Sequence, residues 1–150
     1  MNAPAPVAAL AIADIADADV ADVVALWQRC GLTRPWNDPA GDIALARRNP
    51  NSTVLVGREG GEIVATAMVG HDGHRGWVYY VAVDPDWRTK GFGSAMMDAA
   101  EAWLRAAGVP KLQLLVRREN AKAGAFYQSI GYEKADTIVF AKWVDGRAKT

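Results

Sequence analysis

The residues most able to do chemistry lie at positions 88–94, where a strand-like run leads into a helical pattern. Two glycines, Gly91 and Gly93, are separated by a single residue at the expected start of that helix. Glycine has no Cβ, so the backbone there can approach a ligand closely, and the first N–H groups of a helix have no partner within it. These groups lie at the positive end of the helix dipole, and Arg88 and Lys90 add positive charge beside them. The spacing therefore predicts an anion site of the kind that binds phosphate.

Two common nucleotide-binding motifs do not fit this loop. A Walker loop would need Gly-x-x-x-x-Gly-Lys-Ser/Thr, which is absent. A dinucleotide fingerprint would need a third glycine where Met96 stands. A nucleotide-binding domain is therefore disfavoured, and the non-functional alternative is a glycine-rich helix start that binds nothing.

The pattern Arg88-x-x-Gly91-x-Gly93, after Val83-Asp84-Pro85, resembles motif A of the GNAT N-acetyltransferase superfamily. A downstream segment is similar to the family's Asn…Ala…Phe-Tyr-x-x-x-Gly-Phe/Tyr pattern. Its matching residues are Asn120, Ala123, Phe126, Tyr127, Gly131 and Tyr132. The resemblance is firm over 79–132 and extends across 12–143. The type it resembles is the small single-domain bacterial enzyme, similar to ribosomal-protein alanine acetyltransferases.

The resemblance implies that acetyl-coenzyme A is the cosubstrate and gives the matched positions their roles. The backbone of Val81, Ala82 and Val83 would pair with the pantetheine arm where two strands splay apart, and an N–H near Val83 would polarise the thioester carbonyl. The pyrophosphate loop would comprise Arg88, Thr89, Lys90, Gly91, Phe92, Gly93 and Ser94, and the second segment would contribute Asn120, Ala123, Phe126 and Tyr127.

Tyr127 would also protonate the leaving thiolate, since a phenol with a pKa of ~10 carries its proton at neutral pH. The structural alternative for Tyr127 is a half-buried aromatic that packs through its ring. For Asn120 it is a helix N-cap, which is compatible with a cofactor contact.

The general base is harder to find in the sequence. Many family members use a glutamate on one of the two splayed strands, but Trp77–Val83 contains no carboxylate. Leu115 stands where the ribosomal-protein enzymes carry a glutamate. The remaining candidates are His71, Asp72, His74, Glu119 and a water held by backbone carbonyls. Of these, His74 is retained as a catalytic acid or base. A metal site in the His71–His74 turn is weakly indicated, and a polar hairpin loop is the preferred interpretation.

The acceptor pocket is assigned to Trp36, Asn37, Tyr79 and Tyr80. In the family the first two helices and their loop cover the acceptor, so Trp36 is either a pocket wall or a hydrophobic anchor beside a helix cap. Successive strand residues point to opposite faces, so one of Tyr79 and Tyr80 approaches the acceptor cleft while the other packs under a helix. The basic residues Arg105, Lys111, Arg117, Arg118 and Lys122 are either a solvated surface or a contact for the ribose 3′-phosphate of the cofactor.

Hydrophobic periodicity predicts the elements that must position these residues. Helices are expected from about Asp19 to Gly31, from Pro39 to Arg48, from Phe92 to Ala106 and from Asn120 to Ile130. Strands are expected at 7–12, 53–57, 63–69, 77–83, 112–116 and 137–143, with 112–116 central and buried on both faces. The fold class is α/β (α+β), a GNAT-like, mostly antiparallel twisted sheet with helices on both faces and splayed central parallel strands.

The 150 residues predict a single N-acetyltransferase domain over 1–150, with loose tails at 1–6 and 146–150. Lys plus Arg and Asp plus Glu are both 17, so the formal net charge is zero, which argues against non-specific nucleic-acid binding. Cys30 is the only cysteine, which excludes an intramolecular disulfide and a multi-cysteine metal site. Because Cys30 is far in sequence from both motifs, an acetyl-cysteine intermediate is not expected. No membrane span or basic signal-peptide start is found, so a cytoplasmic protein is expected.

The sequence thus predicts an enzyme that transfers acetyl from acetyl-coenzyme A to a primary amine, directly in a ternary complex. The acceptor is a peptide α-amine, a lysine or a small-molecule amine. No metal, nucleic acid or membrane partner is expected, and a homodimer is left open. The main alternative is a non-catalytic acyl-coenzyme A-binding or sensing module, which stays open because no general base is identified on the strand.

Overall fold

Strand and helix patterns alternate along the chain, and the computed structural model, which describes residues 10–147, places most of them as the periodicity predicts. The strands are β1 (Ala11–Asp14), β2 (Ser52–Glu59), β3 (Glu62–His71), β4 (Gly76–Val83) and β5 (Leu112–Leu114). The α-helices are α1 (Val20–Arg29), α2 (Pro39–Arg48), α3 (Phe92–Ala106) and α4 (Ala121–Ser129), and short 3-10 helices cover Asp17–Asp19 and Pro85–Trp87. The chain falls into two compact units, residues 1–115 and 116–150.

The first unit is built on a sheet of order β1-β2-β3-β4-β5. Its first four strands are antiparallel neighbours, and only β4 and β5 run parallel. The turn between β2 and β3 is made by Gly60 and Gly61, which both have positive φ, 59° and 85°. That conformation matches the twist of a tight hairpin and is open to glycine at little cost. The predicted mixed, mostly antiparallel sheet is therefore confirmed.

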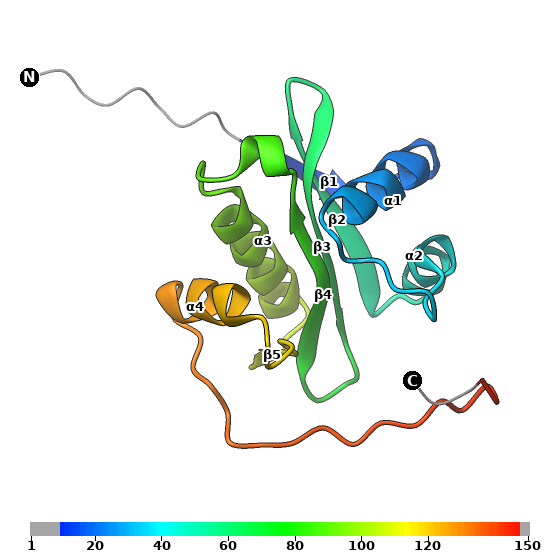
Figure 1. Ribbon diagram of the computed structural model, residues 1–150, viewed down its shortest axis with the longest axis vertical. Coiled ribbons are helices and arrows are strands. Elements are labelled where there is room, and N and C mark those ends of the chain that lie inside the picture. The colour runs from blue at the N-terminus through cyan, green and yellow to red at the C-terminus, as the bar shows by residue number, and fades with distance from the viewer. Residues whose placement is uncertain (1–9, 148–150) are drawn as a thin grey trace, which may run out of the picture. The chain divides into compact units, whose positions relative to one another are not determined.

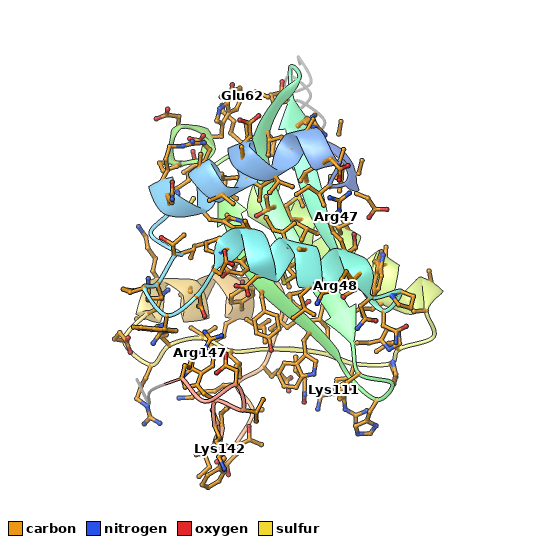
Figure 2. The ribbon with its side chains drawn as sticks, turned by 90° about the vertical axis from the view of Figure 1, so that its right-hand side faces the viewer. Arg47, Arg48, Glu62, Lys111, Lys142 and Arg147 are labelled. Atoms are coloured by element: carbon orange, nitrogen blue, oxygen red, sulfur yellow. The ribbon has the colours of Figure 1, made fainter. Side chains whose placement is uncertain are left out.

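Helices cover both faces of this sheet (Figure 1). Helices α1 and α2 lie side by side over one face, as Figure 2 shows from the front, and α3 lies over the other. The apolar stripe of α1 buries Val23, Leu26 and Trp27 completely, and α3 does the same with Met96 and Met97. Burial of these stripes is what fixes the helices on the sheet.

An aspartate lies at the start of each of the first two helices. The Asp38 carboxylate accepts a hydrogen bond from the Gly41 N–H at 3.1 Å, and Pro39 occupies the first turn of α2. At the start of α1, the Asp19 side chain makes no capping hydrogen bond. It instead accepts a hydrogen bond from the Ala16 N–H at 2.9 Å and pairs with Arg58, so it ties the preceding 3-10 turn to the sheet.

Two strand predictions are wrong. The segment 112–116 is not a central strand buried on both faces: β5 ends at Leu114, at the margin of the sheet, and Leu115 is 52% exposed. The ladder with β4 stops at the pair Val78↔Leu114, so nothing holds the following residues in the sheet. The expected strand at 137–143 is not formed in the structure, and Phe140 is 90% exposed. Strand-like composition does not make a strand without a paired neighbour.

The second unit contains α4 and the segment that follows it. Residues 7–9 of the expected first strand and most of the expected tails lie outside the described residues. Along the part of the chain that the structure describes, no helix is both long and apolar enough to cross a membrane.

Candidate active site

The site is organised around the far half of β4, where the sheet opens. Strand β4 pairs with β3 along both halves, as far as Val83, but it pairs with β5 only from Gly76 to Val78. Among residues 10–147, no strand therefore pairs with the β5-facing edge of β4 from Tyr79 onward. Unpaired strand edges present N–H and C=O groups to whatever extended chain approaches. This is the splayed geometry that the resemblance implied.

A β-bulge sits within this open half. Met68 of β3 pairs with Tyr79, and Thr66 pairs with Ala82. Between these two pairs β4 advances by three residues while β3 advances by two. The extra residue in β4 bends the strand and re-aims the groups beside it. Tyr80 accommodates the bulge with a φ of 51°, a conformation that a bulky side chain rarely adopts.

The Tyr80 side chain turns toward α1 and α2. Its ring stacks on Trp27 with a centroid separation of 3.7 Å and an interplanar angle of 6°. Its hydroxyl donates to Asp42 Oδ2 at 2.8 Å. Burial, followed by this hydrogen bond to the carboxylate, raises the pKa of Tyr80 well above its ordinary value. Of the two neighbouring tyrosines, Tyr80 is thus the one that packs under helices, and Tyr79 remains 47% exposed.

The predicted phosphate loop has the geometry of an open helix N-terminus. Gly91 caps α3 with a φ of 79°, and its carbonyl accepts the first helical hydrogen bond, from the Ala95 N–H at 3.0 Å. The N–H groups of residues 92–94 therefore have no partner within the helix. An ideal Cβ built on Gly91 would meet no atom within 4 Å, so the space in front of the helix is open.

Side chains of the loop divide between solvent and core. Arg88, Thr89 and Lys90 are exposed, whereas Phe92 is buried and stacks near Trp87 at 6.2 Å. Phe92 can therefore serve a ligand only with its backbone N–H, because its ring belongs to the core.

The end of β4 is fastened to the end of α1, which the sequence did not predict. The buried Asp84 carboxylate accepts a hydrogen bond from Arg29 at 2.9 Å and caps the turn at Asp86 N–H, also at 2.9 Å. The Cys30 thiol donates to the Val83 carbonyl at 3.3 Å. Burial raises the pKa of Cys30, opposed by the neighbouring Arg88. Cys30 thus lies beside the end of β4 that is predicted to bind the cofactor, despite its distance in sequence, and its thiol proton is engaged on the Val83 carbonyl.

In the second unit, Asn120 precedes α4 as its N-cap and Tyr127 lies on the helix. The Asn120 Oδ1 accepts a hydrogen bond from the Ala123 N–H at 3.1 Å, so its role as N-cap is confirmed. The Tyr127 ring makes edge contacts with Phe126 at 5.0 Å and with Tyr132 at 5.9 Å. Burial raises the pKa of Tyr127, which keeps its hydroxyl protonated at neutral pH. The cofactor contacts of Asn120, Ala123, Phe126 and Tyr127 stay predictions.

His74 lies in the exposed turn before Gly76, at the paired end of β4. At ~3.3 Å per residue, Gly76 is about 10 Å from Tyr79, where the open half begins, and about 23 Å from Val83, where it ends. In the same turn the Asp72 Oδ1 accepts hydrogen bonds from the N–H groups of His74 and Arg75, at 2.9 and 2.8 Å. The turn closes on its own hydrogen bonds, as a polar hairpin loop does.

The remaining predicted residues are spread over the surface. Trp36 and Asn37 are half-buried in the loop between α1 and α2, which is tightened by a hydrogen bond from Arg34 to the Gly31 carbonyl at 2.9 Å. Of the five basic residues, Arg105 pairs with Glu101 at 3.2 Å, and Lys111 is exposed just before β5, as labelled in Figure 2. The other three, Arg117, Arg118 and Lys122, belong to the second unit.

Comparison with known proteins decides the family. The family model described as "Acetyltransferase (GNAT) family" matches residues 16–132. The chain belongs to the GNAT acetyltransferase family. A protein of Yersinia pestis (strain Pestoides F) named "Acetyltransferase" is 42% identical to it over 124 residues, which is 83% of this chain and 88% of that protein.

Solved structures show the same GNAT fold at low sequence identity. An aminoglycoside 6′-N-acetyltransferase from Acinetobacter haemolyticus has a TM-score of 0.74 and 16% identity, covering 90% of this chain and 99% of its own. The enzyme AAC(6′)-Iy, solved with a bisubstrate analogue of coenzyme A, has a TM-score of 0.77 and 14% identity, covering 90% of this chain and 98% of its own. At these identities the similarity concerns the fold alone.

Proposed function

We propose that this GNAT acetyltransferase transfers the acetyl group of acetyl-coenzyme A directly to a primary amine in a ternary complex. The observation that carries the proposal is the continuity of residues 79–94. The unpaired edge of β4 leads within a few residues to the open N-terminus of α3. An extended thiol-bearing arm suits the first, and a pyrophosphate suits the second.

In this proposal the residues divide the chemistry as follows. Backbone groups of Val81–Val83 bind the arm, and an N–H near Val83 donates to the thioester oxygen as negative charge develops there. The amine nitrogen bonds to the carbonyl carbon while the carbon–sulfur bond breaks. Tyr127 gives its proton to the departing sulfur, which its raised pKa allows at neutral pH. Residues 88–94 hold the phosphates.

The amine's own proton has no carboxylate on β4 to accept it. In the proposal the acceptor therefore attacks as the neutral amine. The proton that its nitrogen sheds as the amide forms passes to water, and the Tyr127 phenolate recovers from water the proton that it gave to sulfur. A peptide α-amine, with a pKa of about 8, meets that requirement more easily than a lysine at about 10.4. Small-molecule amines remain in the acceptor class, which accords with the aminoglycoside enzymes that share this fold.

The test combines binding with turnover. Calorimetry should show acetyl-coenzyme A bound at least tenfold more tightly than NAD or ATP. Thiol release should then be followed with a panel of peptide α-amines, lysine peptides and small-molecule amines, with mass spectrometry to identify the acetylated product. The kcat/KM should rise toward the pKa of each acceptor and shift when the acceptor is changed.

Three outcomes would change the proposal. Tight acetyl-coenzyme A binding without thiol release on any amine would indicate a binding or sensing module, the alternative favoured by the missing carboxylate. Equal affinity for NAD or ATP would point to a nucleotide site. An inflection that stays near pH 6–7 with every acceptor and disappears in His74→Ala would identify a histidine base.

A further inference from the structure

Tyr80 is one of two non-glycine residues with positive φ among residues 10–147, and the other is Thr89 in the phosphate loop. A bulky residue keeps this strained conformation only where several surrounding contacts hold it in place. Such residues are concentrated at functional sites. Tyr80 directly precedes the residues that the proposed function assigns to the cofactor, 81–83 and 88–94, and Thr89 lies among them. The contacts that hold Tyr80 therefore bear on how that stretch is presented.

Three elements hold Tyr80 in place, each at a different point. From α1, the fully buried Trp27 stacks on its ring. From β3, the Thr66 hydroxyl donates to the Tyr80 carbonyl at 2.9 Å and accepts from Trp27 Nε1 at 2.8 Å. From α2, the Asp42 carboxylate accepts the Tyr80 hydroxyl at 2.8 Å. Ring, backbone and hydroxyl are thus each fixed by a separate partner.

The three residues that contact Tyr80 differ in how deeply they are buried. Trp27 and Thr66 have no exposed surface, so they belong to the packed core and serve the fold wherever the active site lies. Asp42 is partly exposed near the start of α2, and it forms no ion pair within the part of the chain that the structure describes. Its contact with Tyr80 ties α2 to the bulge of β4.

We propose that Asp42 is a positioning residue for acetyl transfer, acting through the Tyr80 hydroxyl. The hydrogen bond holds the bulge of β4 in the conformation that aims the backbone of residues 81–83 at the thioester. This inference rests on the proposed function, since it concerns the same backbone groups. Asp42 itself contacts neither substrate in this scheme, and its effect passes entirely through Tyr80.

Three substitutions separate this role from simple structural support. Tyr80→Phe keeps the stacked ring and removes only the hydroxyl, and Asp42→Ala removes its acceptor. Asp42→Asn keeps the shape and an amide oxygen that can still accept the hydroxyl proton. The matched control is Thr53→Val, which removes another hydroxyl-to-carboxylate hydrogen bond, from Thr53 to Asp14 at 2.9 Å, at the β1–β2 side of the sheet.

The expected result is a kcat about tenfold lower in Tyr80→Phe and Asp42→Ala, with acetyl-coenzyme A affinity within about threefold of the wild type. The double variant should be no slower than either single one, because both remove one interaction. Asp42→Asn should recover most of the activity, and Thr53→Val should retain it. Backbone amide hydrogen exchange should accelerate at residues 79–83 in the two loss variants and stay unchanged at the β2–β3 hairpin.

The exchange measurement does not need an acceptor, so it separates the two hypotheses. If no amine is acetylated but exchange at 79–83 accelerates as expected, the Asp42–Tyr80 contact holds the bulge and the proposed function fails. If the wild type is active while Tyr80→Phe keeps its kcat, the positioning role is refuted. Multiplicative losses in the double variant would also refute it, because they would show that the two residues act independently.

Discussion

Gly91 offers the sharpest test of the phosphate site because its surroundings allow a side chain without a clash. Its φ of 79° is the left-handed region, and the space where a Cβ would stand is open to 4 Å. Any other L residue there meets conformational strain of about 1–2 kcal/mol but no steric overlap. Gly91→Glu and Gly91→Gln share that strain and have the same length. They differ only in a negative charge at the mouth of the proposed site.

The size of the charge effect can be worked out from the geometry. A carboxylate on Gly91 would lie within roughly 6 Å of a phosphate held by the N–H groups of residues 92–94. Two unit charges at that distance repel by about 0.7 kcal/mol at the dielectric constant of water and by about 3 kcal/mol at an effective value of 20. A pyrophosphate carries more than one charge, so we expect Gly91→Glu to bind acetyl-coenzyme A at least tenfold more weakly than Gly91→Gln, a difference of ~1.4 kcal/mol.

Calorimetry on both variants measures this ratio, and a melting curve tests that each is folded. The curve adds an independent check, since a carboxylate at a helix N-terminus is stabilising by about 0.3–1 kcal/mol. Gly91→Glu should therefore melt no lower than Gly91→Gln while binding the cosubstrate less tightly. Equal affinities in two folded variants would place the phosphates elsewhere and refute the loop assignment.

Three further predictions concern the acid, the acceptor wall and stability. Tyr127→Phe keeps the ring contacts and removes the proton, so kcat should fall about 10²–10⁴-fold with acetyl-coenzyme A still bound, and full activity with chemistry limiting would end the acid assignment. Trp36→Ala should raise the acceptor KM and leave acetyl-coenzyme A affinity alone, whereas a lower melting temperature with an unchanged KM would make Trp36 an anchor. The Ala16 N–H and Arg58 lower the pKa of Asp19, so Asp19→Asn should reduce the free energy of unfolding at pH 7 by about 1.5–3 kcal/mol. That difference should shrink below about pH 4 in denaturant titrations, because a depressed pKa stabilises the fold above the unfolded value and the effect is lost as the carboxylate protonates.

Local features of the fold could be predicted because each has a local cause. The Asp38-Pro39 start of α2, the Gly60-Gly61 hairpin and the Gly91 start of α3 depend on the conformations open to a few adjacent residues. The family resemblance likewise rested on short segments, 83–93 and 120–132. The resemblance also implied the opening beside β4, which the early end of the β4–β5 ladder confirms.

The long-range contacts around the opening could not be predicted from the sequence in this way. Trp27 and Thr66 are 39 residues apart, Asp42 and Tyr80 are 38 apart, and Arg29 and Asp84 are 55 apart. No spacing rule links such pairs, because they meet only after α1 and α2 have packed on the sheet. The bulge at Tyr80 could not be predicted for a related reason. The sequence of β4 is typical of a regular strand, and the register shift arises only from its pairing with β3. The predicted strand at 137–143 failed where composition was the only evidence.

These observations give the missing carboxylate of β4 a physical context. In a site with a glutamate on the strand, that side chain would have to point into the opening. Here the residue at the bulge, Tyr80, stacks on Trp27 and donates its hydroxyl to Asp42, so its side chain is not available as a base. In the proposed function the chemistry depends instead on backbone N–H groups near the bulge and on Tyr127 as the acid. A site built in this way should be sensitive to substitutions that relax β4, and substitution of a solvent-exposed carboxylate such as Asp98 on α3 is a control that should leave activity unchanged.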